Sequence, residues 1–386
     1  MHVKKTYLDY AASTPVDGRV LEAMLPYFSG HFGNPSSIHM YGQAADYALE
    51  QAREVVAESL NSKPSEIIFT GCGTESDNLA LRGGALARRK QTGANRLLIS
   101  PVEHHAVLHT AEQLRDEFGF ELELLPVDEF GQVDPAAVAE RLSNKVAVVS
   151  AVFANNEIGT INPIAEIGAI CRKFDVPFHT DAVQAAAWLD IDVVRESVDL
   201  LALGAHKFYG PKGVGALYVR EGVKLTPSQT GGKQEYGLRA GTQNVPLIVG
   251  MAEALKLARK EREKRISDVL PLRDILIDSV LSEIPRSKLT GHPVNRLPNH
   301  ASFVFEGVDG NALLMQLDMA GFACSSGSAC RVGTPKPSEI LTSIGIASSW
   351  ALGSLRVTLG KDTTPGDINS FLDFLPGLIA RARHTN

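Results

Sequence analysis

The chain has 386 residues, with 38 Lys and Arg against 44 Asp and Glu, and four cysteines. This length predicts one large domain with a smaller one, and the mildly negative charge disfavours binding to nucleic acid or anionic membranes, which requires a basic patch. The N-terminus lacks the apolar run of a signal peptide, the longest apolar run (146–154) is too short to span a membrane, and four cysteines make no disulfide framework, so we expect a soluble cytoplasmic protein.

Short apolar strand patterns alternate with helical patterns through the first two thirds of the chain. The predicted strands cover 66–70, 95–100, 121–127, 146–153, 177–182, 199–207 and 213–220. Helical patterns follow the first four of them, and Asp134 with Pro135 can begin the third of these helices. This alternation predicts an α/β fold with a mostly parallel sheet and helices on both faces, which binds ligands at the carboxyl ends of its strands.

The texture of the sequence changes after a long helical pattern at 245–284, which can bridge two domains. Two strand patterns, "ASFVFEG" and "SLRVTLG", and helical segments near 310–320, 337–345 and 364–383 then predict a smaller α+β domain. We expect a large domain over residues 15–260 and a small domain formed by residues 1–14 and 261–386.

Three segments at the ends of predicted strands contain residues that can carry chemistry. In "FTGCGTESDN", Thr74 stands at the start of a helix, whose N-terminus can bind phosphate. In "HTDAVQ", Asp181 follows a strand, with Gln184 three residues later. In "ALGAHKFYGPKGVG", Lys207 follows an apolar run, where burial would lower its pKa and make it a nucleophile. Taken singly, the first segment is more simply an ordinary capped turn. The second is as readily a cap beside a surface amide, and a lysine is usually a solvated surface residue.

Together the three segments match one cofactor. A lysine for a Schiff base, an acid for a pyridinium nitrogen and a phosphate cup at a helix start are what pyridoxal 5′-phosphate requires. Their order along the chain is that of the large aminotransferase-like class.

Two of the cysteines, Cys324 and Cys330, lie in "ACSSGSAC", a segment of small and hydroxylated residues. A buried structural cysteine normally has larger apolar neighbours, and a metal site or disulfide has a recognisable spacing. His105 and His109 are spaced i, i+4 near His104, but no acidic or cysteine ligand motif accompanies them, so we expect no metal.

Over essentially its whole length, the chain resembles cysteine desulfurases of the NifS/IscS type. The motifs that carry this resemblance are "YLDYAASTP", "FGNPSSIH", "FTGCGTESDN", "EHHAVL", "ANNEIG", "HTDAVQ", "AHKFYGPKGVGALYVR", "GGKQEYGLRAGTQN", "SSGSAC" and "SLRVTLG". The resemblance implies a homodimeric, class V aminotransferase-like enzyme of pyridoxal phosphate fold type I, with a mostly parallel seven-stranded sheet in its large domain.

The resemblance also implies a role for each matching residue. Lys207 would form the Schiff base, Asp181 would pair with the pyridine nitrogen, and His104 would stack on the ring and transfer protons. The other implied cofactor contacts are Gln184 and Asn156 at the ring edge, Gly73, Thr74 and His206 at the phosphate, and Thr242 at the phosphate of the partner subunit. Arg356 would clamp the substrate carboxylate, with Asn34 nearby.

The implied reaction converts L-cysteine to L-alanine. Lys207 would take the Cα proton, and the Cys330 thiolate would accept the sulfur as a persulfide, for transfer to acceptors such as iron–sulfur cluster assembly proteins. A thiol with a pKa of roughly 8.5 is mostly protonated at pH 7, so Cys330 would need activation by His104 or by the substrate's environment. The small residues before Cys330 would permit the swing from cofactor to acceptor.

Several other functions remain open. A selenocysteine lyase, an aminotransferase and a kynureninase-like hydrolase share the expected fold, and the loop thiol disfavours only the last two. A non-catalytic iron–sulfur assembly protein would need ligand spacing that the four cysteines do not supply.

Gly204 generates a first testable prediction, because many members of the resembled family have a phosphate-binding serine three residues before the Schiff-base lysine. We expect a backbone N–H or a water to replace that hydroxyl here, so that cofactor retention is weaker. Gly204→Ser should therefore raise the affinity for pyridoxal phosphate, measured by equilibrium titration of the cofactor-free protein. An unchanged affinity would count against this role.

Overall fold

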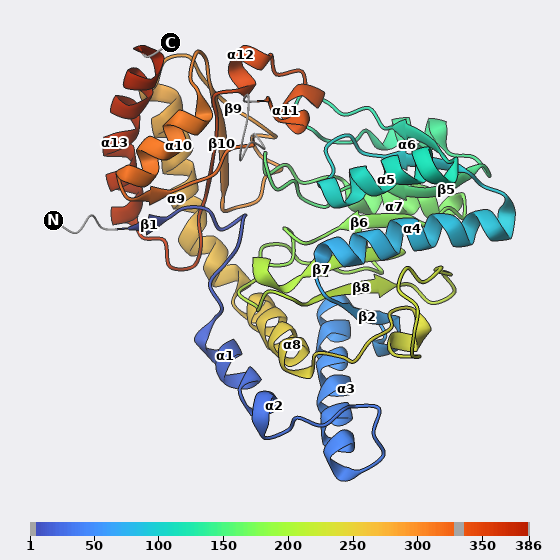
Figure 1. The fold of residues 1–386 in the computed structure, drawn as a ribbon. Helices are drawn as coiled ribbons and strands as arrows, with labels where there is room; N and C mark the ends of the chain where they lie inside the picture. Colours follow the sequence, from blue (N-terminus) through green and yellow to red (C-terminus); the bar gives the residue numbers. More distant parts are fainter. Residues whose placement is uncertain (1–4, 328–335, 385–386) are drawn as a thin grey trace.

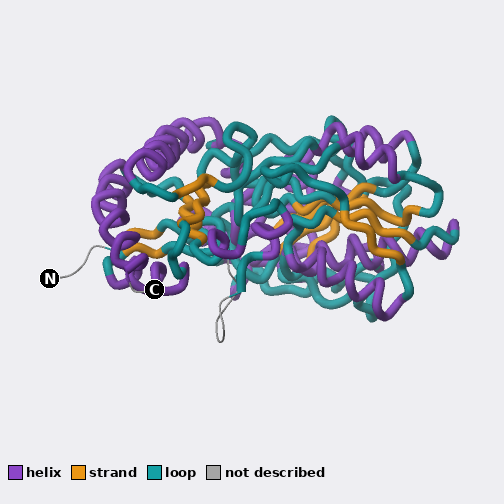
Figure 2. The backbone as a smooth tube through the Cα atoms, turned by 90° about the horizontal axis from the view of Figure 1, so that it is seen from above, coloured by secondary structure: helices purple, strands orange, loops and turns teal. Residues whose placement is uncertain are grey.

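The computed structural model describes residues 5–327 and 336–384. The ribbon shows a large sheet packed between helices and a smaller sheet beside it, next to which both chain ends lie (Figure 1). Seen from above, the two groups of strands are separate, each with helices around it (Figure 2). Within the described residues, no helix is both long and apolar enough to cross a bilayer.

Seven strands form the large sheet, in the order β2-β8-β7-β6-β5-β3-β4. They are β2 (Ile67–Thr70), β3 (Arg96–Ile99), β4 (Glu121–Leu124), β5 (Val146–Ser150), β6 (Phe178–Asp181), β7 (Leu200–Gly204) and β8 (Gly215–Val219). Only β8 runs antiparallel to its neighbours, β2 and β7. The predicted mostly parallel, seven-stranded sheet is confirmed, and every strand lies within its predicted run.

Helices cover both faces of this sheet because successive strand residues point to opposite sides. In β3, Leu97 and Ile99 pack in a cluster with α4 (Gly73–Thr92) and α5 (His105–Phe118), whereas Leu98 belongs to the main core. The main core includes α3 (Met40–Leu60), α6 (Pro135–Arg141), α7 (Ile164–Lys173) and α8 (Val245–Lys260). Asp134 caps α6 by accepting from the Ala136 N–H, and Pro135 is its first residue, as predicted.

The smaller sheet is antiparallel, in the order β12-β10-β9. Its strands are β9 (Ser287–Leu289), β10 (His300–Phe305) and β12 (Ser354–Thr358), and its helices are α9 (Arg262–Glu283), α10 (Gly310–Met319), α11 (Glu339–Ser343), α12 (Ser348–Ala351) and α13 (Pro365–His384). The helical stretch predicted at 245–284 is two helices, α8 and α9, which meet at Glu261.

The N-terminal segment joins this second region, because β1 (Thr6–Tyr7) pairs in parallel with β11 (Phe322–Ala323). The chain then passes through α1 (Gly18–Met24) and α2 (Pro26–Ser29) to reach α3. This crossing agrees with placing residues 1–14 in the small domain, although the domain limits at 14 and 260 stay a proposal.

A buried ion pair fixes the loop that follows β8. Arg53 on α3 contacts both carboxylate oxygens of Glu235, at 2.8 and 3.0 Å, and donates to the Ile67 carbonyl at 2.7 Å. Glu235 Oε2 also accepts from the Phe69 N–H at 2.8 Å. Both charged side chains are almost fully shielded from solvent, so each requires the other.

Loss of this pair should destabilise the protein strongly. We expect Glu235→Ala to lower the free energy of unfolding by about 3–5 kcal/mol, because it leaves the Arg53 charge buried without its partner. The matched control is Glu221→Ala, which removes an ion pair with Lys63 whose two side chains are 71 % and 66 % exposed. It should change the free energy of unfolding little, because both charges stay hydrated. Urea unfolding of both variants measures the difference, and similar losses would contradict this account.

Candidate active site

A pocket at the carboxyl edge of the large sheet brings together most of the residues singled out in the sequence. The predicted residues that line it are Gly73, Thr74, His104, Asn156, Asp181, Gln184, His206, Lys207 and Arg356. All but Arg356 follow or end strands of the large sheet, whereas Arg356 lies on β12 of the small sheet. The parallel sheet thus gathers distant segments at one edge, as expected for this architecture.

Lys207 ends a short 3₁₀ turn (Ala205–Lys207) directly after β7. Its Nζ donates to the backbone carbonyls of Ala11 and Ala12, at 2.6 and 2.7 Å. Burial and the nearby Arg356 guanidinium lower the pKa of Lys207 from 10.5 to about 8. The environment therefore brings the unprotonated, nucleophilic amine within reach of neutral pH, as the sequence predicted.

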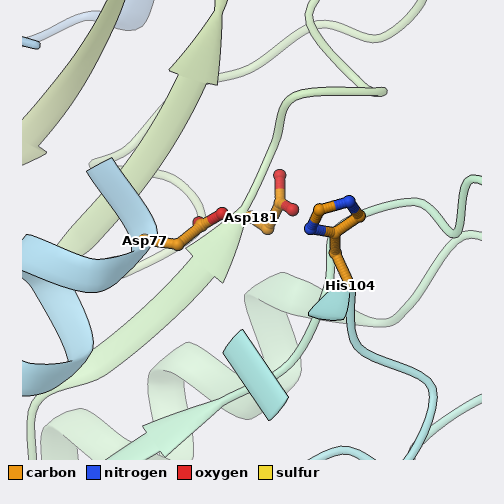
Figure 3. A group of neighbouring side chains, drawn as sticks. All are labelled: Asp77, His104 and Asp181. Carbon is orange, nitrogen blue, oxygen red and sulfur yellow. The ribbon is translucent and has the colours of Figure 1, made fainter. Parts of the chain in front are cut away.

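Asp181, the last residue of β6, lines the pocket and is buried beside His104 and Asp77 (Figure 3). One polar side-chain atom from each of these residues lies within 4.8 Å of the other two. Burial and the neighbouring Asp77 carboxyl raise the pKa of Asp181, which accepts one backbone hydrogen bond, from the Val183 N–H at 2.8 Å. A cation placed against it would restore its negative charge.

His104 occupies the N-cap position of α5. Its Nδ1 accepts from the Ala106 N–H at 3.1 Å, so in the neutral ring Nε2 carries the proton. Loss of solvent around the ring lowers the pKa of His104. The ring turns toward Asp181 in Figure 3, and Nε2 is the nitrogen left to exchange a proton with a ligand.

The start of α4 opens into the pocket without a side-chain cap. The cap position is Cys72, not Thr74, and the Cys72 side chain makes no cap hydrogen bond, so the first N–H groups of the helix are free of a local side-chain partner. A Cβ on residue 73 would lie only 2.7 Å from the Val183 side chain, so there is no room for a side chain at this position. With glycine there, the backbone N–H stays accessible from the pocket. At Gly204, by contrast, a Cβ would meet its nearest neighbours at 3.4 Å, so serine needs only small adjustments.

Arg356 reaches the pocket from β12 in a fixed orientation. Its Nη2 contacts Asp9 Oδ1 at 2.8 Å, and its Nη1 donates to the Asn156 carbonyl at 3.0 Å. Ser325 Oγ donates to the other Asp9 oxygen at 2.7 Å. Gln184 is held similarly, because its Nε2 donates to the Ala11 carbonyl at 2.8 Å.

Two predicted residues that the structure describes, Asn34 and Thr242, do not line the pocket. Asn34 is exposed and accepts from the Ser36 N–H, and Thr242 is exposed on the loop after Glu235. Cys330 lies outside the described residues. Cys324 packs against the core, and burial raises the pKa of its thiol.

Two functional neighbours escaped the sequence interpretation. Asp77 is three residues after Thr74, one helical turn into α4, so its helix spacing offered a weak signal. Asp9 is far from Arg356 in the chain, and its motif, "YLDYAASTP", was noted without a role for the acid.

The pocket fits pyridoxal phosphate better than a metal ion. Asp77, His104 and Asp181 lie at distances that a metal ion could bridge. However, the pocket also presents two basic side chains, Lys207 and Arg356, and the positive N-terminal end of α4. These features suit an anionic group with a carbonyl and a basic ring nitrogen.

Comparison with known proteins agrees with this chemistry. The family described as aminotransferase class-V matches residues 6–371. A cysteine desulfurase IscS of Methanosarcina thermophila is 45% identical over 381 residues, 99% of this chain and 93% of the relative. Another, of Dictyoglomus turgidum, is 46% identical over 380 residues, 98% and 96% of the two chains.

Solved structures agree in the fold. A NifS-like protein superposes with a TM-score of 0.90 and 34% identity, covering 98% of this chain and 100% of its own. A structure described as SspA in complex with cysteine gives a TM-score of 0.81 and 36% identity, covering 94% and 100%. The chain therefore belongs to the class-V aminotransferase family and, within it, to the cysteine desulfurases of the NifS/IscS type.

Proposed function

We propose that this protein is a pyridoxal phosphate-dependent cysteine desulfurase that takes sulfur from L-cysteine and leaves L-alanine. The observation that carries the proposal is one pocket holding a lysine of lowered pKa, a buried aspartate, an uncapped helix start and an oriented arginine. The names of the IscS relatives, and the cysteine bound in the SspA structure, favour L-cysteine as the substrate.

Each part of the cofactor would have its own residues. Lys207 would hold it covalently, and Asp181 would face the ring nitrogen. His104 would cover the ring, with Gln184 and Asn156 at its edge. The phosphate would bind the Gly73 N–H, the Thr74 hydroxyl and His206. Burial lowers the pKa of His206 to about 4, so its neutral ring would act as a hydrogen-bond donor.

When bound, pyridoxal phosphate supplies an electron sink for bond changes at the substrate's α and β carbons. Arg356 would hold the substrate carboxylate through its guanidinium. The Lys207 amine would take the Cα proton, and His104 Nε2 would exchange protons with the substrate. The chain's own contribution is therefore to orient the amino acid and to hold each proton at a defined atom.

Cys330 would receive the sulfur. Its thiolate would form an S–S bond with the substrate sulfur while the substrate's Cβ–S bond breaks. The carbon fragment would take up one proton at Cβ, regain one at Cα from Lys207, and leave as L-alanine. The resulting persulfide on Cys330 would pass the sulfur to an acceptor, such as an iron–sulfur cluster assembly protein.

A homodimer is part of this proposal. Large apolar side chains are exposed along the segment from α1 to α3, namely Leu25, Phe28, Phe32, Ile38, Met40, Tyr41 and Tyr47. Such a gathering favours a protein partner, and a second copy would bring the exposed Thr242 to the neighbouring phosphate. We also propose a cytoplasmic location, where free thiols such as Cys72, Cys171 and Cys324 stay reduced.

The rate at which cofactor-free protein binds pyridoxal phosphate covalently should rise with pH and reach half its maximum near pH 8. The pKa of Lys207 is lowered to about 8, and only the unprotonated amine attacks a carbonyl, so the rate falls as pH drops below that value. Absorbance of the bound cofactor follows the reaction. Lys207→Ala should abolish it, whereas substitution of the exposed Lys63 should not. A midpoint near 10, typical of a solvated lysine, would contradict the burial argument.

The two cysteines of "ACSSGSAC" provide a matched test of the nucleophile. Cys330→Ala should reduce L-alanine release from L-cysteine by roughly 10³-fold or more, as loss of a nucleophile does in other enzymes. Cys324→Ala should leave most activity, because burial keeps that thiol protonated. Desulfuration that survives the loss of Cys330 would refute the mechanism. Running both variants with selenocysteine also distinguishes a desulfurase from a selenocysteine lyase.

A further inference from the structure

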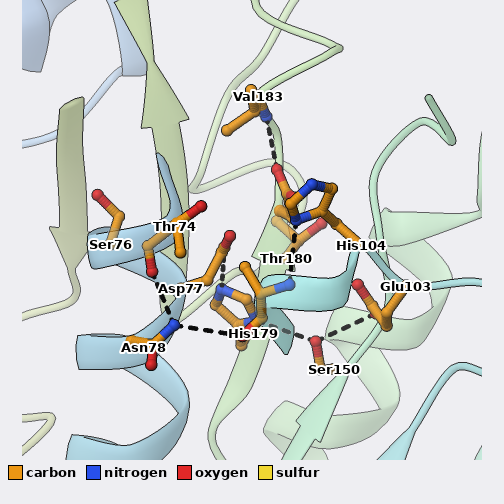
Figure 4. A network of polar contacts seen from close by, with 12 residues as sticks. Thr74, Ser76, Asp77, Asn78, Glu103, His104, Ser150, His179, Thr180 and Val183 are labelled. Atoms are coloured by element: carbon orange, nitrogen blue, oxygen red, sulfur yellow. Dashed lines mark hydrogen bonds and ion pairs between the residues drawn. The ribbon is translucent and has the colours of Figure 1, made fainter. Parts of the chain in front are cut away.

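A chain of buried polar side chains extends from the candidate pocket into the large sheet (Figure 4). Ser150 Oγ, at the end of β5, lies 3.2 Å from Glu103 Oε1 and 2.9 Å from His179 Nδ1 on β6. His179 Nε2 faces Asp77 Oδ1 on α4 at 3.4 Å. All four residues are at most 1 % exposed, so their hydrogen atoms must be shared among themselves rather than with water.

The position of one hydrogen determines the others. Ser150 has a single hydroxyl hydrogen, and when Glu103 accepts it, Oγ becomes an acceptor for His179 Nδ1–H. His179 is neutral near pH 7, because burial lowers its pKa to about 4. Its Nε2 is then a bare lone pair, which is satisfied only when Asp77 carries a proton. In this arrangement Glu103 is the charged end of the chain.

In the opposite arrangement the net charge is the same, but Asp77 carries it instead of Glu103. A protonated Glu103 would donate to Ser150, Ser150 to Nδ1, and Nε2–H to a charged Asp77. Burial raises the pKa of both carboxyls, but Glu103 also accepts a backbone hydrogen bond from Val152, which favours its charged form whichever way the Ser150 hydroxyl points. Among the described residues, Asp77 Oδ1, His179 Nε2 and Glu103 Oε2 have no hydrogen bond, and the first two face each other at 3.4 Å. The contacts therefore favour the first arrangement.

The charge on Asp77 matters because Asp181 is its neighbour. Groups facing Asp181 come from several elements: Asp77 on α4, Glu103 and His104 before α5, His179 on β6, and Lys207 after β7. Two adjacent carboxyls in a buried site resist ionising together. A charged Asp77 would consequently keep Asp181 protonated.

We propose that Glu103, Ser150 and His179 are positioning residues that hold a proton on Asp77, so that Asp181 becomes the charged carboxylate of the pocket. The inference deepens the proposed function, in which Asp181 pairs with the ring nitrogen of the cofactor. The hydrogen arrangement itself is a property of the chain and does not depend on the substrate.

The first test reads the tautomer of His179 directly. Full-length protein with ¹⁵N-labelled histidine gives imidazole nitrogen shifts by NMR, and His179→Gln assigns the signals. We expect the neutral Nδ1–H form at pH 7, although free histidine favours Nε2–H. An Nε2–H tautomer or a charged ring would overturn the proposal, whereas the expected result holds whether or not the protein proves to be a desulfurase.

The second test first moves the negative charge from Glu103 to Asp77 and then removes it from Asp77. Ser150→Ala deprives Glu103 of its donor and Nδ1 of its acceptor, so the proton should shift to Nε2 and the negative charge to Asp77. The pH below which pyridoxal phosphate affinity falls should then rise by about one unit or more, because Asp181 ionises later.

The double variant Ser150→Ala/Asp77→Asn provides the rescue, since asparagine cannot carry the charge. We expect the pH dependence of pyridoxal phosphate affinity to return to that of the wild type, and Asp77→Asn alone to show no upward shift. No shift in the single Ser150 variant, or a shift that persists in the double variant, would overturn the proposal. Should the Ser150 variant fail to fold, the wild-type tautomer decides the question alone.

Discussion

Charge buried where the two sheets meet is the constraint on which the rest of the site depends. Arg356 on the small sheet and Asp9 after β1 form an ion pair whose side chains are only 9 % and 15 % exposed. A buried charge without a partner would be strongly destabilising, so these segments must stay in register. The second donor contact of Arg356, to the Asn156 carbonyl, extends the link to the large sheet. One guanidinium thus connects the N-terminal segment, the small sheet and the carboxyl edge of the large sheet.

The same burial determines the chemistry of the pocket. Lys207 loses solvent, lies near the Arg356 guanidinium and is held by two carbonyls of the N-terminal segment, so its amine is reactive near neutral pH. Burial acts in the opposite direction on the carboxyl groups, because it raises their pKa values. Asp77 and Asp181 cannot both ionise at low cost, and the hydrogen bonds behind them therefore decide which one carries the charge. The same buried charges therefore stabilise the contact between the sheets and set the reactivity of Lys207 and Asp181.

The fold brings the site residues together, and individual side chains determine which reaction the site can perform. A parallel sheet brings the start of α4, the N-cap of α5, the end of β6 and the turn after β7 to one edge, whatever reaction follows. What distinguishes a desulfurase is a thiol that can reach this edge. The assignment of Cys330 rests on its motif, and the contrast with Cys324, which is partly buried against the core, makes that assignment open to test.

The sequence by itself determined the strands of the large sheet, and it predicted the residues that we propose for the site. Short apolar runs predicted all seven strands of the large sheet. The segments around Thr74, Asp181 and Lys207 predicted the cofactor, because each is a short local pattern at a strand end. Only the tertiary structure decided the cap at Cys72, the division of the 245–284 stretch at Glu261, and the pairings of Arg356 with Asp9 and of His179 with Asp77. These pairings join segments up to 347 residues apart. Local periodicity reports which face of an element is buried, whereas the partner of a buried charge depends on how the sheets and helices pack.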